Sequence, residues 1–110
     1  MKKLALVFCL SLGLGLLAVD ASPSPAPPAQ IVHMKNFAFT PAKVTVHVGE
    51  TVEWINDDSA QHSTTENSKA WDSGELSQGQ SWSHTFEKAG VYRYYCDDHA
   101  FMKAEVDVTT

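Results

Sequence analysis

The sequence of 110 residues has few cysteines, a shortage of basic residues and no run of like charges. Eight Lys and Arg stand against thirteen Asp and Glu, which gives a formal net charge of −5 at pH 7. Proteins that bind nucleic acid gain much of their affinity by neutralising phosphates with Lys and Arg, so this balance argues against that class. The length is enough for one domain and too short for two.

Leucine is almost absent from most of the chain, because seven of the eight leucines lie within residues 4–17. Lys2 and Lys3 precede an apolar run over residues 4–19, and small side chains follow it. A basic start, an apolar segment and a small-residue exit are typical of a secretory signal peptide. We therefore predict a signal peptide over residues 1–21, export to the periplasm and no stable membrane insertion after cleavage. The alternative, a retained membrane anchor, is disfavoured because the run is slightly short for spanning a bilayer.

Residues 22–30 (SPSPAPPAQ) hold four of the five prolines and no large apolar side chain, so we predict an extended arm or linker there. The folded domain is expected over residues 31–110. Beyond residue 21 the chain has a single cysteine, Cys96, and a net charge of −6. A single thiol cannot form an internal disulfide, and a free thiol is a liability in an oxidising compartment. We therefore expect the folded domain to protect Cys96.

From residue 31 onward, apolar and polar residues alternate with a period of two over several short runs. Such alternation is typical of half-buried antiparallel strands. It predicts strands over residues 44–48, 51–54, 81–86, 91–96 and 104–108. Several short strands with turn signals between them close most naturally as an all-β sandwich of two sheets. Residues 56–80 are polar and less regular, so we expect loops with one or two short strands, and an exposed Trp71.

The most informative local pattern is Cys96-x-x-His99-x-x-Met102, which starts at the last inward position of a predicted strand. A thiolate, an imidazole and a thioether in one short loop favour copper. Two His and one Cys with a weak axial Met form the blue-copper electron-transfer site. That arrangement needs a second histidine from elsewhere in the chain. His62, in the loop after a predicted strand, is the best candidate, and His84 is the reserve.

With these residues, the sequence resembles the cupredoxins, most closely the amicyanin-like, plastocyanin-type members with a short ligand loop. The similarity extends over residues 31–110. It is carried by residues 36–41 (NFAFTP), 46–56 (VHVGETVEWIN), 72–74 (DSG), 90–96 (GVYRYYC) and 99–102 (HAFM). The resemblance implies a Greek-key β-sandwich. It also implies one type 1 copper per chain, with His62, Cys96, His99 and axial Met102 as ligands.

Three residues depart from the pattern of these relatives. Gln61 stands where amicyanins have proline, and Ala100 replaces the proline usual after the second ligand histidine. Ser63 follows His62 where many relatives have asparagine. In the family, the residue after the first histidine ties the two ligand loops together by a hydrogen bond. A serine can make a shorter version of that bond.

The resemblance implies a small soluble blue-copper carrier that shuttles single electrons between larger redox partners through Cu(II) and Cu(I), and that is not an enzyme. We expect a monomer. Asp97 and Asp98 lie next to His99 in the sequence, so the partner is expected to have a basic docking face. A c-type cytochrome or a periplasmic redox enzyme fits this description.

Three other functions compete with electron transfer. A periplasmic copper-binding or delivery protein usually has Met- or His-rich stretches, but beyond residue 21 only Met34 and Met102 are methionines. A copper oxidase or reductase needs a second centre with further histidines, commonly His-x-His, and the sequence has no such pair. A metal-free immunoglobulin-like module leaves the coincidence of Cys96, His99 and Met102 without a reason.

Overall fold

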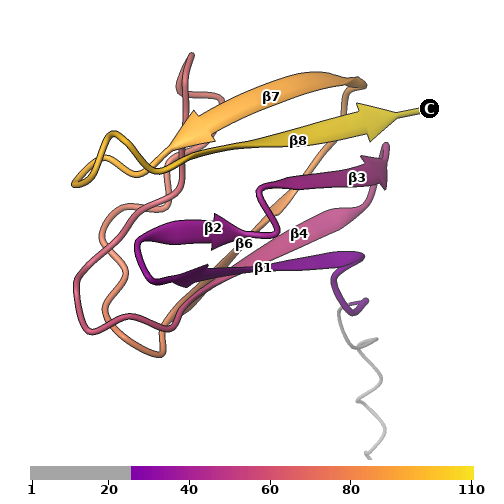
Figure 1. Cartoon of the computed structure of the whole chain (residues 1–110). Coiled ribbons are helices and arrows are strands. Elements are labelled where there is room, and N and C mark those ends of the chain that lie inside the picture. The colour runs from indigo at the N-terminus through magenta and orange to yellow at the C-terminus, as the bar shows by residue number, and fades with distance from the viewer. Residues whose placement is uncertain (1–25) are drawn as a thin grey trace, which may run out of the picture.

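The structure is a computed structural model that describes residues 26–110 and shows two packed β-sheets (Figure 1). The strands are β1 (Gln30–Lys35), β2 (Ala38–Thr40), β3 (Lys43–His47), β4 (Thr51–Asn56), β5 (Thr65–Glu66), β6 (Ser81–Thr85), β7 (Gly90–Tyr95) and β8 (Lys103–Thr109). One sheet has the order β2-β1-β4-β6 and the other the order β3-β8-β7-β5. The predicted all-β sandwich is therefore confirmed.

The predicted signal peptide over residues 1–21 lies outside the described residues, as do residues 22–25 of the predicted arm. β1 begins at Gln30, one residue before the expected start of the domain. The backbone N–H of Ala29 already donates to Thr51 O at 2.8 Å, so the end of the arm lies against β4. Within residues 26–110, no helix is long and apolar enough to cross a membrane.

The strand directions differ in part from the antiparallel expectation. β1 is parallel to β4, and β3 is parallel to β8, whereas the other neighbouring pairs are antiparallel. Alternation of apolar and polar residues reports which face is buried and does not depend on the direction of the neighbouring strand. The chain changes sheets between β2 and β3, and again between β3 and β4 at the Gly49-Glu50 turn. These changes place strands that are not consecutive side by side, as in a Greek key.

The core lies between the two sheets and is built from the inward residues of the alternating strands. Val52 and Trp54 of β4 are fully buried. Tyr94 of β7 meets Trp54 edge-on from the other sheet, with ring centroids 5.5 Å apart. Burying a large apolar side chain stabilises a fold by about 1.5–3 kcal/mol. The packed strands therefore give a firm support to the loops at their ends.

The expectation that Trp71 is exposed is wrong. Trp71 is only 4% exposed, and its indole N–H donates to Thr64 Oγ1 at 3.0 Å. Its ring centroid lies 5.6 Å from that of Trp54. The Asp72-Ser73-Gly74 turn follows directly, but turn residues determine where the chain reverses and not whether their neighbour is buried. The short strand expected within residues 56–80 is present as β5, which pairs with β7.

Three loops meet at the end of the sandwich drawn on the left in Figure 1: the β1–β2 turn and the segments after β4 and β7. The β1–β2 turn consists of Asn36 and Phe37, with left-handed φ angles of 53° and 57°. Two positive φ angles are typical of the type I′ turn of a two-residue hairpin, in which glycine is favoured. A left-handed phenylalanine costs about 1–2 kcal/mol. Other contacts must therefore stabilise this turn.

Candidate metal centre

The first loop of the candidate centre runs from Cys96, directly after β7, to Met102, directly before β8. Its backbone is closed by hydrogen bonds from His99 N to Cys96 O at 3.2 Å and from Met102 N to His99 O at 2.8 Å. A third bond joins Cys96 N to Met102 O at 3.1 Å. Cys96 is fully buried, Met102 is buried, and His99 is half-buried. The two-residue spacings therefore fold these three residues into one tight loop.

His62 enters from the segment after β4. Its backbone exchanges two hydrogen bonds with Leu76, of 3.1 and 2.8 Å, and its side chain is fully buried. Asn56, the last residue of β4, holds the same segment, because its Nδ2 donates to Ala60 O at 2.9 Å and to Leu76 O at 2.8 Å. Its Oδ1 accepts from Asp58 N at 2.8 Å. The buried amide thus fixes the path of the chain from β4 to His62.

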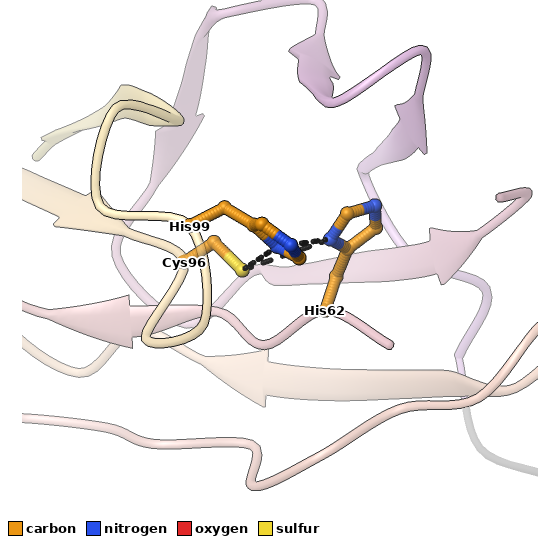
Figure 2. Close-up of side chains that lie close together, drawn as sticks. All are labelled: His62, Cys96 and His99. Carbon is orange, nitrogen blue, oxygen red and sulfur yellow. Dashed lines mark hydrogen bonds between the residues drawn. The ribbon is translucent and has the colours of Figure 1, made fainter. Parts of the chain in front are cut away.

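Figure 2 shows the side chains of His62, Cys96 and His99 converging from these two loops. The Nδ1 atoms of His62 and His99 are 3.3 Å apart, and Cys96 Sγ is 3.7 Å from each of them. Within residues 26–110, these three form the one group of His, Cys, Asp or Glu side chains arranged to share a metal ion. The structure thus brings together three of the four predicted ligands. The fourth, Met102, closes the loop that carries Cys96 and His99.

The size and chemistry of this triangle fit copper. Plane geometry puts the point equidistant from its three atoms about 2.1 Å from each. First-row metals such as zinc bind imidazole nitrogen at about 2.0–2.1 Å and thiolate sulfur at about 2.3 Å. One thiolate with two imidazoles is a soft donor set that selects copper for electron transfer. The burial of His62 and Cys96 keeps water from two of the three donors.

Ser63 links the two loops. Its backbone N–H donates to Cys96 Sγ at 3.4 Å, and its Oγ accepts a hydrogen bond from Asp97 N at 2.8 Å. The bond to sulfur joins the backbone after His62 directly to the Cys96 side chain. The hydroxyl makes the short inter-loop bond that the sequence predicts for a serine at this position.

Asp58 lies behind His62. Its Oδ2 is 2.9 Å from His62 Nε2 and accepts a hydrogen bond from Phe37 N at 2.9 Å, and its Oδ1 accepts one from Asn36 N at 2.8 Å. Burial acts to raise the pKa of the Asp58 carboxyl, but the hydrogen bonds from Phe37, His62 and Asn36 outweigh it and lower the pKa. A charged carboxylate can only accept, so His62 Nε2–H donates to Asp58, and in the neutral imidazole the Nδ1 lone pair then faces Cys96 and His99.

Phe37 covers the two histidines from outside. Its ring meets those of His62 and His99 edge-on, with centroid distances of 5.2 and 4.9 Å, and stacks on Phe101 at 6.4 Å. Phe37 is 42% exposed and Phe101 70% exposed, so both rings also face solvent. No role for Phe37 follows from the strand and ligand patterns. Its one signal in the sequence is that Asn36-Phe37 stands where Asn-Gly is the usual turn pair.

His84, the reserve ligand, is outside this group. It lies on β6, where its ring stacks on Trp82 at 5.9 Å and meets Phe86 edge-on at 4.8 Å. Partial burial lowers the pKa of its imidazole. His84 is therefore a packed side chain of the sheet, as its parity with Trp82 and Phe86 predicts.

Carboxylates gather beside the Cys96–Met102 loop. A hydrogen bond with Asp98, a small loss of hydration and the negative charges of Asp98 and Asp97 together raise the pKa of the exposed Glu75 carboxyl. Asp97 and Asp98 are both exposed. The surface next to His99 is therefore acidic.

A family model described as copper binding proteins of the plastocyanin/azurin family matches residues 29–109. Amicyanin from Paracoccus versutus is 30% identical over 85 residues, which cover 73% of this chain and 64% of that protein. The chain thus spans slightly less than two thirds of that amicyanin. Plastocyanin from Scenedesmus fuscus is 32% identical over 83 residues, covering 64% of this chain and 85% of that protein.

Solved structures give the same fold. The Cu(I) form of an amicyanin mutant superimposes with a TM-score of 0.70 and 30% identity, over 76% of this chain and 85% of that chain. A Cu-containing nitrite reductase from Thermus scotoductus gives a TM-score of 0.73 and 27% identity, over 86% of this chain and 25% of that chain. The region matched by the family model contains both loops of the candidate centre.

Proposed function

Because the chain belongs to the plastocyanin/azurin family of copper-binding proteins, we propose that it carries single electrons between larger redox proteins. The observation that carries the proposal is the triangle of His62 Nδ1, His99 Nδ1 and Cys96 Sγ, with sides of 3.3, 3.7 and 3.7 Å. We assign the metal to these three residues, and Met102 would be the fourth ligand. A type 1 copper bound there supplies one-electron chemistry between Cu(II) and Cu(I).

The role of the protein is to hold the donor atoms in one arrangement. Three backbone hydrogen bonds close the loop from Cys96 to Met102, and Ser63 ties that loop to the segment of His62. Donors and dipoles that are already in place need little reorganisation when the charge between them changes. A fixed ligand set of this kind supports fast electron transfer.

His99 is the proposed metal ligand closest to solvent, since it is half-buried while His62 and Cys96 are fully buried. Electron transfer falls steeply with distance, so a partner has to approach this edge. The apolar surface of Phe37 and Phe101 surrounds it, and exposed acidic side chains lie in the same loop. We propose a partner with a basic docking face, such as a c-type cytochrome or a periplasmic redox enzyme.

We further propose that the protein works as a monomer in the periplasm, without catalytic activity of its own. In this proposal residues 1–21 are the signal peptide, residues 22–30 an arm and residues 31–110 the copper domain. The single metal-ligating group within residues 26–110 supports a carrier over an oxidase or reductase, which needs a further centre.

An absorption spectrum of the purified protein with one equivalent of Cu(II) tests the proposal. We expect an intense visible thiolate-to-copper band and a higher melting temperature with copper, because the metal binds the native site far better than the unfolded chain. Cys96→Ser is the matched control, which should fold but lose the band. Tight, colourless binding of Cu(I) with no such band would instead favour copper delivery, and equal melting temperatures under saturating copper would refute a specific site.

A further inference from the structure

The carboxylate of Asp58 connects the buried His62 to the turn that carries Phe37. Oδ2 lies 2.9 Å from His62 Nε2 and accepts from Phe37 N at 2.9 Å, while Oδ1 accepts from Asn36 N at 2.8 Å. The Asp58 side chain is 14% exposed, so water competes only weakly for these bonds. Its own backbone N–H is held by the buried amide of Asn56 at 2.8 Å. The carboxylate is therefore fixed between His62 and the β1–β2 turn.

The turn depends on this support. Asn36 and Phe37 are both left-handed, and a side chain such as that of Phe37 is unfavourable where glycine is the usual residue. An unfavourable backbone conformation persists only when contacts with the surrounding structure stabilise it, and residues in such conformations are common at functional sites. The left-handed backbone at Phe37 places its ring edge-on against both His62 and His99.

We propose that Asp58 is a positioning residue of the copper centre that couples two features. It keeps the proton of His62 on Nε2, so that Nδ1 is free for the metal, and it holds Phe37 as a cover over both imidazoles. A neutral imidazole can carry its proton on either nitrogen, so the acceptor at Nε2 decides which one binds. The identity of the metal rests on the proposed function, whereas the coupling is a property of the protein without copper.

The first measurement compares Asp58→Asn with Asp57→Asn in the copper-free protein. Asp57→Asn is a matched control, because the substitution removes the same charge at the preceding residue. Asp57 also bonds a histidine, with His33 Nδ1 at 2.8 Å from its Oδ2. Nitrogen NMR at about pH 8, above the ordinary histidine pKa, reads the tautomers directly. We expect His62 to carry its proton on Nε2 in the wild type and in Asp57→Asn, and to show a mixture of tautomers in Asp58→Asn.

The second measurement is copper affinity, by competition with a chelator. Loss of the outer partner of a ligand histidine typically weakens metal binding about 10–100-fold. We expect a loss in this range for Asp58→Asn and none for Asp57→Asn. The reduction potential of Asp58→Asn should rise, because the lost negative charge favoured Cu(II) over Cu(I).

Phe37→Gly separates the two roles of Asp58. It keeps the backbone N–H that Asp58 accepts, so the His62 tautomer should stay as in the wild type. The part of the ring-current shifts of the His62 and His99 ring protons that comes from Phe37 should disappear, and the chelator should remove copper faster. In Asp58→Asn the same ring-current shifts should weaken although Phe37 is present, which a role confined to His62 does not explain.

Either an unchanged His62 tautomer or unchanged ring-current shifts in Asp58→Asn would overturn the coupling, whatever the copper affinity. If that variant does not fold, Asp58→Glu decides. Its longer carboxylate should keep the Nε2 proton but weaken the Phe37 shifts, and wild-type shifts in this variant would overturn the coupling. A wild type that binds no copper, yet shows these tautomer and shift differences, would refute the proposed function and leave the coupling standing.

Discussion

Replacing Asn56 with alanine should destabilise the copper-free protein strongly, because its buried side chain fixes the segment between β4 and His62. The side chain is fully buried. It makes three hydrogen bonds of 2.8–2.9 Å, to Ala60 O, Leu76 O and Asp58 N. Alanine removes all three and leaves the Leu76 carbonyl without this donor.

The expected loss follows from the cost of these bonds. A hydrogen bond within a protein contributes about 1 kcal/mol net, so three give about 3 kcal/mol. Small domains have unfolding free energies of about 5–15 kcal/mol, so Asn56→Ala should remove a large part of the total. The same change should loosen the segment that carries His62 and Asp58, and with it the affinity for copper.

Urea unfolding followed by tryptophan fluorescence measures this loss. The protein must be free of copper, since bound metal adds its own stabilisation. Asn67→Ala is the control: Asn67 is exposed, and its replacement should change stability by less than about 0.5 kcal/mol. The claim that the amide organises this segment would be refuted if Asn56→Ala lowered the free energy of unfolding by less than about 1 kcal/mol, with an unchanged slope of that free energy against urea concentration.

Three further predictions concern the loop and the core. Met102→Gln should keep copper and lower the reduction potential, because a weak axial thioether tunes the potential more than it holds the metal; loss of copper on dialysis would contradict this. The double variant Asp97→Asn, Asp98→Asn should slow association with a basic redox partner at low salt and flatten its salt dependence in stopped-flow experiments, with the copper spectrum unchanged. Burial raises the pKa of the Tyr94 hydroxyl, so stability to urea should be insensitive to this group below about pH 10 and fall as the pH rises above it. The fall should be shallower in Tyr94→Phe, and equal slopes would show that Tyr94 does not contribute to it.

Local patterns in the sequence carry a large part of the fold and of the candidate site. Val52 and Trp54 alternate with polar neighbours because one face of β4 is buried, and that alternation is visible without coordinates. Cys96 and His99 stand at a fixed short spacing, and the structure brings both next to His62. Patterns of this kind arise from contacts within one strand or one loop.

The features that escape prediction depend on contacts between distant segments. Asp58 and Phe37 are 21 positions apart and meet through a backbone N–H, a group that almost every residue has, so no residue pattern marks the pair. Trp71 is buried because the chain after β4 folds over the core, which the adjacent turn residues do not reveal. The direction of paired strands escapes for the same reason, since alternation is identical in parallel and antiparallel pairs.

The candidate centre straddles the interface between the two sheets, which has a consequence for the order of events during maturation. His62 follows β4 of one sheet, whereas Cys96 and His99 follow β7 of the other. A half-assembled chain with only one sheet in place offers either one imidazole or a thiol with one imidazole. The three candidate donors lie together only when the two sheets are docked, so a metal that needs all three binds the assembled sandwich far better than a chain with one sheet in place. The visible absorption band expected with Cu(II) would therefore report only molecules in which both sheets are docked.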